Sequence, residues 1–230
     1  MKLLAFELKG QLAHFRKPDT TVTHSTYPFI TRTALHGLVS SILGLKKLEG
    51  ENWFGLSLEE PVATSYQQMS LLGKGWLGGG KSFNRPTTIE LIVNPKYKVF
   101  YTGPYEEKLA NMLKQNESVY HTYLGSAFCL TKPQFIEEDD ALEIIPETDQ
   151  VIETNSIVPI HIVSELKLYG NVSYSRAGGV RYQEIEDRVF TGNINFVYES
   201  NGGKVLFTYK KEDFPPTKFA KTKKEVVCLW

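Results

Sequence analysis

The residues best suited to chemistry stand in one short segment, His14-Phe15-Arg16-Lys17, which directly follows a predicted strand. A guanidinium can hold a phosphate through two hydrogen bonds, and an aromatic ring can stack on a nucleic-acid base. Arg32 stands at the start of a predicted helix, where free backbone N–H groups also favour a phosphate. An ordinary salt bridge is the alternative for Arg32, and the sequence leaves both open.

Two further segments carry most of the unbalanced positive charge. Residues 73–105 contain five cations and one anion, and residues 204–224 contain seven lysines and two acids. The first segment includes GKGWLGGGKSFNRP, whose mixture of cations, glycines and aromatic rings can follow a phosphate backbone and stack on bases. Its candidate contacts are Lys74, Trp76, Lys81, Phe83 and Arg85.

A third candidate segment, YSRAGGVRYQEIEDR, lies late in the chain. Arg176, Arg181 and Arg188 surround Gly178-Gly179 there. The segment is either a second site that contacts a phosphate backbone or simply the tip of a hairpin.

Composition excludes several classes of protein. The chain has 230 residues, of which 26 are basic and 26 acidic, so its formal net charge of zero argues against an indiscriminate nucleic-acid binder. With 41% apolar and 12% aromatic residues, a disordered chain is not expected. No apolar run approaches the roughly 18 residues of a membrane span, and the first residues lack the features of a secretory signal. Cys129 and Cys228 cannot form a disulfide framework, so we expect a reduced, cytoplasmic protein that does not contact a membrane.

The motifs of common catalytic and cofactor sites are absent. There is no GxSxG, no HExxH and no cluster of His and Cys at metal-ligand spacing, and GWLGGGKS misses the glycine spacing of a phosphate loop. We therefore expect no cofactor, no metal and no catalytic residue. A metal-independent ribonuclease remains an alternative, because His14 or the Tyr120-His121 pair could act on a 2′-hydroxyl. The competing interpretation is that these residues position RNA without cutting it.

Hydrophobic periodicity predicts the elements that position these residues. Residues 2–12 alternate as a strand, and residues from Leu35 to Leu43 repeat at helical spacing. Thr31 or Thr33 can cap this helix, and Gly44 or Gly50 can end it.

The next elements follow the same reasoning. We expect strands at 61–72, at 89–93 with a continuation at 99–101, and at 127–130, a helix at 105–115, and a projecting glycine-rich segment at 73–80. The order is strand, helix, strand, projection, strand, helix, strand. This is the βαββαβ order of a ferredoxin-like or RRM-like domain.

The second part of the chain differs in character. Residues 137–149 hold seven acids and no cation and are predicted to be an exposed connection. Beyond them, residues 157–163 are expected to be extended, and Asn201-Gly202-Gly203 separates two alternating runs, which predicts a hairpin over 194–209. The fold class is therefore α+β, with an RRM/ferredoxin-like domain at 1–140 followed by a mostly antiparallel β region at 150–230.

One segment, GQLAHFRKPDTTVTHSTYPFITRTALHGLVSSILGL, resembles the amino-terminal signature of CRISPR-associated family five (Cas-five) of the RAMP superfamily, in its type I-B-like form. In that family an Ala-x-Phe-Arg-x-Pro-like loop follows a strand, and a Pro-x-x-x-Arg-Thr segment leads into a small helix. The matching residues here are Ala13 to Pro18, Pro28 to Thr33 and Ala34 to Leu45. Tyr123-Leu124-Gly125 is similar to a triplet of the same family.

The resemblance implies an RRM-like core with a projecting β-hairpin thumb, which falls at about 73–86. It implies a guide-RNA-binding subunit of the Cascade surveillance complex, which caps the crRNA and grips its repeat-derived 5′ handle. The implied partners are the crRNA, the backbone subunit and the large subunit, with target DNA reached only indirectly through guide pairing. One branch of the family cuts precursor crRNA, so an endoribonuclease is the alternative function.

Overall fold

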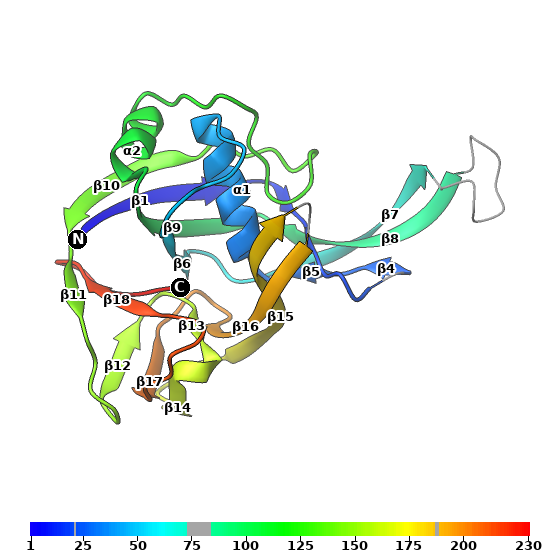
Figure 1. The fold of residues 1–230 in the computed structure, drawn as a ribbon. Helices are drawn as coiled ribbons and strands as arrows, with labels where there is room; N and C mark the ends of the chain where they lie inside the picture. The colour runs from blue at the N-terminus through cyan, green and yellow to red at the C-terminus, as the bar shows by residue number, and fades with distance from the viewer. Residues whose placement is uncertain (21, 73–83, 187–188) are drawn as a thin grey trace.

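A central antiparallel sheet organises the chain (Figure 1). The computed structural model describes residues 1–230 except 21, 73–83 and 187–188. The strands of this sheet follow the order β10-β1-β9-β6. They are β1 (Lys2–Lys9), β6 (Trp53–Leu58), β9 (Lys96–Thr102) and β10 (Gln134–Asp140).

Both faces of this sheet are covered. Leu4, Phe6 and Leu8 of β1 point into the large core shared with the helices, whereas Leu3 and Ala5 pack on the opposite side against the C-terminal strands. A strand buried on both faces favours a nearly continuous apolar run, because neither side of the pleat meets water. The run KLLAFEL meets that requirement.

The helices described by the structure are α1 (Arg32–Leu43) and α2 (Glu106–Lys114). The Thr31 side chain accepts a hydrogen bond from the Ala34 N–H, and Gly44 ends α1 in the left-handed conformation at φ 72°. Leu35, Leu38 and Val39 lie on the buried face of α1, as their spacing predicts. The helices predicted near 34–44 and at 105–115 are therefore confirmed.

A long hairpin projects from the body of the molecule (Figure 1). It consists of β7 (Thr64–Leu72) and β8 (Asn84–Val93), paired from Thr64 opposite Ile92 to Leu72 opposite Asn84. The short strands β2 (Leu12–Ala13) and β4 (Thr23–His24) also pair with β8, and β3 (Phe15–Arg16) pairs with β5 (Thr26–Tyr27). The predicted contacts Lys74, Trp76, Lys81 and Phe83 lie outside the described residues.

The strand predicted at 61–72 is present as β7, but it forms an arm of the hairpin. The core strand after α1 is β6, which was not predicted, and the strand predicted at 127–130 was wrong. Almost every residue of β6 is buried, so it lacks the alternation that marks a half-exposed strand. The strand predicted at 127–130 is a turn in which only Leu130 makes an isolated bridge, to Tyr123.

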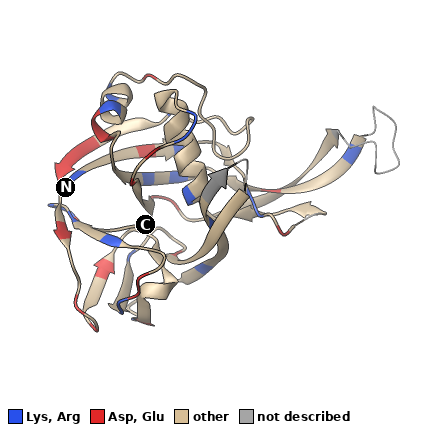
Figure 2. Ribbon diagram, viewed as in Figure 1, with Lys and Arg blue, Asp and Glu red and all other residues tan. Residues whose placement is uncertain are grey.

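The predicted connection at 137–149 was also wrong, because it contains the end of the edge strand β10 and all of β11 (Leu142–Ile144). Figure 2 shows the acidic residues of both strands in red. Glu137 forms ion pairs with Lys98 and Lys224, and Glu138 forms one with Lys114. An edge strand with one solvent-exposed face tolerates charged side chains, so an acidic run alone does not identify a linker.

The remainder of the chain is mostly antiparallel β structure, as predicted. The sheets run β12-β17-β14, β13-β16-β15 and β11-β18-β19. Their further strands are β12 (Val151–Thr154), β13 (Val158–Pro159), β14 (Val163–Leu166), β15 (Tyr174–Glu186), β16 (Val189–Glu199), β17 (Val205–Tyr209), β18 (Lys218–Lys221) and β19 (Val226–Leu229), with a 3₁₀ turn at Ile160–Ile162.

The predicted hairpin over 194–209 was wrong. β16 pairs with β15 and β13, whereas β17 pairs with β12 and β14. The chain does turn at Gly202, where φ is 81° and a Cβ atom would lie 2.8 Å from the Leu58 carbonyl oxygen. The turn therefore sends the chain into a different sheet.

The two parts of the chain share buried side chains. The Phe29 ring meets the rings of Phe196 and Tyr198 edge-on at centroid distances of 5.8 and 5.3 Å, and Phe196 packs on the fully buried Trp230. Within the described ranges, neither helix has the length and apolar character needed to cross a membrane.

Candidate nucleic-acid interface

A groove of about 600 Å³ lies where the projecting hairpin meets the body of the molecule. Its walls come from β3, β4 and β5, the start of α1, Leu71 and Ile89 of the β7–β8 hairpin, the loop at 125–128 and the β15–β16 hairpin. Of the predicted contacts, the groove brings together His14, Phe15, Arg16 and Arg181. None of the described side chains that line it is acidic.

His14 and Phe15 form the floor of the groove. His14 is 5% exposed, and one ring nitrogen, Nδ1, lies 2.8 Å from the Glu90 carbonyl oxygen. Burial lowers the pKa of His14, so its ring is neutral at pH 7. Phe15 is 4% exposed and packs against Tyr97 in the core. The stacking role predicted for Phe15 is not supported by this geometry, because a base has no access to the ring face.

The loop at 125–128 lies directly against this floor, and Gly125 makes the close contact with His14. The His14 N–H donates to the Leu124 carbonyl at 3.0 Å, and Gly125 follows with φ 85°. A Cβ atom on Gly125 would lie 2.1 Å from the His14 carbonyl oxygen, which no side chain tolerates. The close approach explains why glycine follows Tyr123-Leu124.

Arg16 stands on one wall with its side chain exposed. Its Nη2 donates to the Thr20 carbonyl at 3.3 Å, a neutral partner that leaves the charge uncompensated. Lys17 does not line the groove, and its ammonium lies 5.8 Å from the centre of the Tyr27 ring. The loop therefore places the Arg16 guanidinium where a phosphate can reach it.

Arg181 lines the groove from another element, β15. Its Nη1 donates to the Asn193 side-chain oxygen at 3.2 Å, again a neutral partner. The Tyr27 hydroxyl donates to the Gly179 carbonyl at 2.7 Å, which ties β5 to the irregular step of β15 just before Arg181. This hydrogen bond sets the two arginine-bearing walls relative to each other.

Arg85 extends the groove along the hairpin. Leu71 and Ile89 line the groove, Leu71 is paired with Arg85, and alternate residues of a strand share a face. Partial burial, together with Arg16, His14 and Arg85, lowers the pKa of His24 in the groove wall. The positive charges of Arg16 and Arg85 disfavour the protonated form of His24, because like charges repel.

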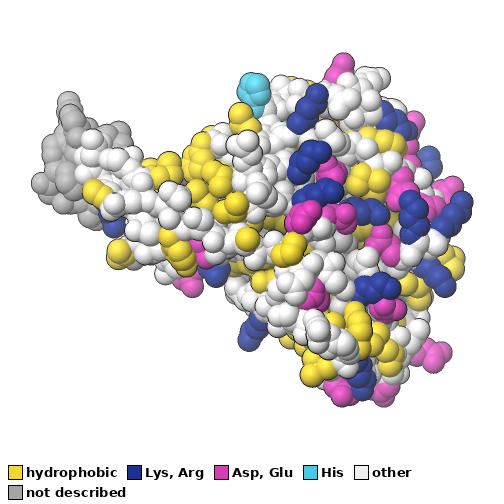
Figure 3. Space-filling model, turned by 180° about the vertical axis from the view of Figure 1, so that it is seen from behind, with side chains coloured by type: hydrophobic (Ala, Val, Ile, Leu, Met, Phe, Trp, Pro, Cys, Tyr) yellow, Lys and Arg dark blue, Asp and Glu magenta, His cyan; other side chains and the backbone are white. Residues whose placement is uncertain are grey.

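The sequence analysis missed three groove residues, His24, Phe128 and Phe190. The two rings are 50% and 39% exposed. Figure 3 shows hydrophobic side chains gathered where the hairpin joins the body. Phe190 continues the alternation of Ile194 and Phe196 back to the start of β16, which was the available signal; Phe128 had none, because it lies in a turn.

Several predicted contacts lie elsewhere. Arg176 is exposed on β15 before the irregular step and does not line the groove, and Arg188 lies outside the described residues. Arg32 lines a separate pocket, which meets the groove only at Thr33. Arg32 is 8% exposed, so its predicted phosphate contact is not part of the groove.

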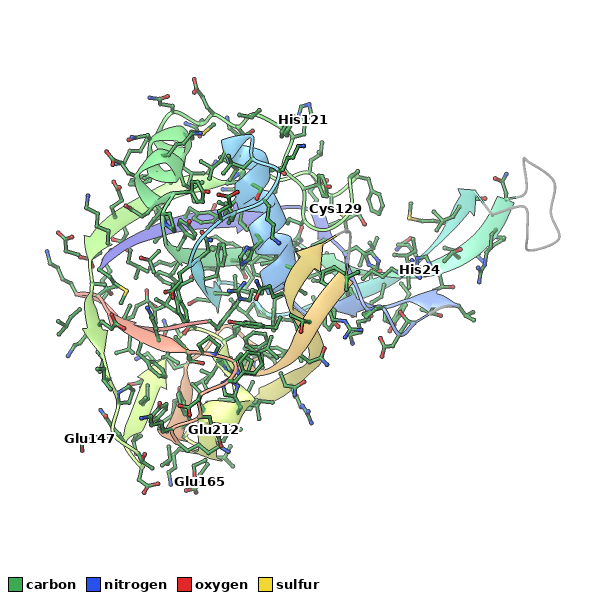
Figure 4. The ribbon with its side chains drawn as sticks, viewed as in Figure 1. His24, His121, Cys129, Glu147, Glu165 and Glu212 are labelled. Carbon is green, nitrogen blue, oxygen red and sulfur yellow. The ribbon has the colours of Figure 1, made fainter. Side chains whose placement is uncertain are left out.

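The candidate catalytic pair, Tyr120 and His121, is exposed on the loop after α2 and lines no part of the groove. Figure 4 shows His121 on this loop, away from His24 at the hairpin base. In the portion that the structure covers, no three His, Cys, Asp or Glu side chains gather closely enough to hold a metal ion.

Comparison with known proteins agrees with this architecture. A crystal structure of a CRISPR protein from Archaeoglobus fulgidus superposes with a TM-score of 0.55 at 15% identity, covering 99% of each chain. A chain of a CRISPR RNA-guided surveillance complex gives 0.50 at 13% identity, covering 86% of this chain and 90% of that one. A chain of the type III-B Cmr-beta complex bound to cognate target RNA and AMPPnP gives 0.53 at 8% identity, covering 88% and 86%. These likenesses establish a shared fold.

The family follows from the sequence itself. No curated protein matches the chain. The model of the family described as CRISPR-associated protein (Cas_Cas5) matches residues 3–180, which is most of the chain; the match includes Arg16 and ends just before Arg181. The chain therefore belongs to the CRISPR-associated protein (Cas_Cas5) family.

Proposed function

We propose that this protein is a guide-RNA-binding subunit of a type I CRISPR surveillance complex (Cascade), where it caps the crRNA and holds its 5′ handle. The observation that carries the proposal is the groove itself. Arg16 on β3 and Arg181 on β15 both line it, each with only a neutral hydrogen-bond partner among the contacts described. A groove lined by cations, with no acid among its described lining residues, attracts a phosphate backbone.

The groove also suits single-stranded RNA in particular. Phe128 and Phe190 present exposed rings on which unpaired bases can stack, a contact that duplex RNA does not allow. We infer that the phosphates run between Arg16 and Arg181 and that Arg85 receives the chain where it reaches the hairpin.

The finer architecture belongs to the same proposal. We infer that β10-β1-β9-β6 with α1 and α2 is an RRM/ferredoxin-like core, because its antiparallel order matches the βαββαβ topology. The β7–β8 hairpin is then the thumb, and it starts well before residue 73. A type I-B-like assembly, partnership with the backbone and large subunits, indirect contact with target DNA and a cytoplasmic location complete the proposal.

We propose binding without cleavage, and a direct assay tests it. Purified protein is mixed with end-labelled repeat RNA in the presence of a chelator. Binding without cuts is expected, and Arg181→Ala should weaken it. Specific cuts that disappear in His121→Ala would replace the binding function with the alternative endoribonuclease. Failure to bind the repeat RNA at low salt would refute the proposal altogether.

A further inference from the structure

A second pocket, of about 340 Å³, lies beside the start of α1, on the far side of Thr33 from the groove. It is formed by α1, the segment from Lys46 to Trp53, β15 and Pro216. This volume is at the lower end of the range for small-ligand sites, about 300–1,000 Å³. It suits one small ligand.

The chemistry of this pocket centres on Arg32, which is 8% exposed. Its Nη2 donates to the Asn52 carbonyl at 3.2 Å, its Nη1 contacts the His36 ring nitrogen, and its guanidinium lies 4.7 Å from the centre of the Tyr182 ring. Among the residues that the structure describes, the buried Nε atom has no hydrogen-bond partner. Each of these partners is uncharged, since burial and Arg32 lower the pKa of His36 to about 3.

A buried guanidinium normally has an anionic partner, because an uncompensated charge loses much of its favourable hydration when it is removed from water. Among the described residues, no carboxylate lies within ion-pair distance of Arg32. Glu51 lines the pocket, but its carboxylate faces Trp53 Nε1 at 3.4 Å and Lys218 at 3.8 Å. Lys46 and Lys47 add positive charge at the rim.

We infer that this pocket binds the phosphate group of a nucleotide. Arg32 has no anionic partner among the described residues, so a phosphate would supply the missing negative charge, and Lys46 adds positive charge at the rim.

The nucleotide that we assign to the pocket is one unit of the bound RNA, and this part of the inference rests on the proposed function. Thr33 lines both the pocket and the groove. On β15, Arg181 lines the groove, and the next two residues, Tyr182 and Gln183, line the pocket. An RNA chain that leaves the groove over the start of α1 therefore delivers a nucleotide to Arg32. A free nucleotide is the other source of the same chemistry.

Titration calorimetry with adenosine 5′-monophosphate, adenosine and inorganic phosphate tests the phosphate site on the full-length protein. The monophosphate should bind, and adenosine should not. Lys46→Glu should weaken monophosphate binding about fivefold or more, whereas Lys108→Glu, a matched charge reversal on α2 outside the pocket, should leave it unchanged. Arg32→Lys, checked for folding by circular dichroism, keeps the charge but loses the fork and should also bind more weakly. Equal affinities for adenosine and its monophosphate, or equal effects of the two charge reversals, would overturn the inference.

RNA binding by the same variants separates the two sources and the two proposals. If Lys46→Glu weakens repeat-RNA binding and removes the ethylation interference at one phosphate that the wild-type protein shows, the nucleotide belongs to the RNA. If it impairs only monophosphate binding, the pocket serves a free nucleotide. If Arg16→Ala and Arg181→Ala abolish RNA binding while the monophosphate never binds, the pocket inference fails and the proposed function stands. If the monophosphate binds but RNA does not, the proposed function fails and the phosphate site stands.

Discussion

Replacing both groove arginines should change the salt dependence of RNA binding by a predictable amount. Arg16 and Arg181 are exposed and hold only neutral hydrogen-bond partners, so each can neutralise one phosphate. For single-stranded nucleic acid, each neutralised phosphate contributes about −0.7 to the slope of log K against log salt. Arg16→Ala combined with Arg181→Ala should therefore make the slope shallower by about 1.4.

The consequence is large enough to measure. Between about 50 and 200 mM salt, the wild-type protein should lose roughly sevenfold more affinity than the double variant. Fluorescence anisotropy with labelled repeat RNA over five salt concentrations gives both slopes. Arg176→Ala is the matched control, because Arg176 is an exposed arginine on the same strand as Arg181 but outside the groove.

The result that would refute this reasoning is specific. If Arg176→Ala shifts the slope as much as Arg181→Ala does, the phosphates do not follow the groove. An unchanged slope in the double variant, with affinity lowered equally at every salt concentration, would mean that the arginines act through folding or through neutral contacts.

Three further perturbations test the framework around the groove. Gly125→Ala should lower the free energy of unfolding by more than about 2 kcal/mol, because φ is 85° and a Cβ would meet the His14 carbonyl; Gly37→Ala, in open space on α1, should stabilise or be neutral in the same thermal melts. Tyr27→Phe should cost about 1 kcal/mol and weaken RNA binding, since its hydroxyl holds the Gly179 carbonyl; normal RNA affinity would contradict the role of that bond. Burial lowers the pKa of His36 to about 3 in the folded protein, so this side chain takes up a proton at a higher pH in the unfolded chain than in the folded one. The free energy of unfolding should therefore fall as the pH drops below about 6.5, by about 2 kcal/mol between pH 7 and 5. Urea melts of His36→Gln should show a smaller decrease, and an identical pH dependence would exclude His36 as its source.

The α1 helix and the helix at 106–114 could be predicted because their determinants are local. Capping by Thr31, termination at Gly44 and the spacing of the apolar residues all act within a few residues. The strands β6 and β10 could not be predicted, because their patterns depend on what covers them. β6 is buried on both faces by distant segments, and β10 carries acids that are compensated by Lys98, Lys114 and Lys224.

The candidate site divides in the same way. Residue types alone identified Arg16 and Arg181 as cations able to hold phosphate, and the Tyr123-Leu124-Gly125 segment as distinctive. Residue types could not show that Phe15 is buried, that Phe128 and Phe190 are exposed, or that Arg32 occupies a separate pocket. Exposure depends on neighbours supplied by other parts of the chain.

The sequence by itself determined the family, the local helices and the stock of cations and rings available for binding RNA, because these depend on residues close together in the chain. Only the tertiary structure decided which of them share a surface. Arg16 and Arg181 are far apart in sequence, and a hydrogen bond from Tyr27 to the Gly179 carbonyl sets their walls relative to each other. The groove is a property of long-range packing, in which distant segments meet because their apolar faces leave water together.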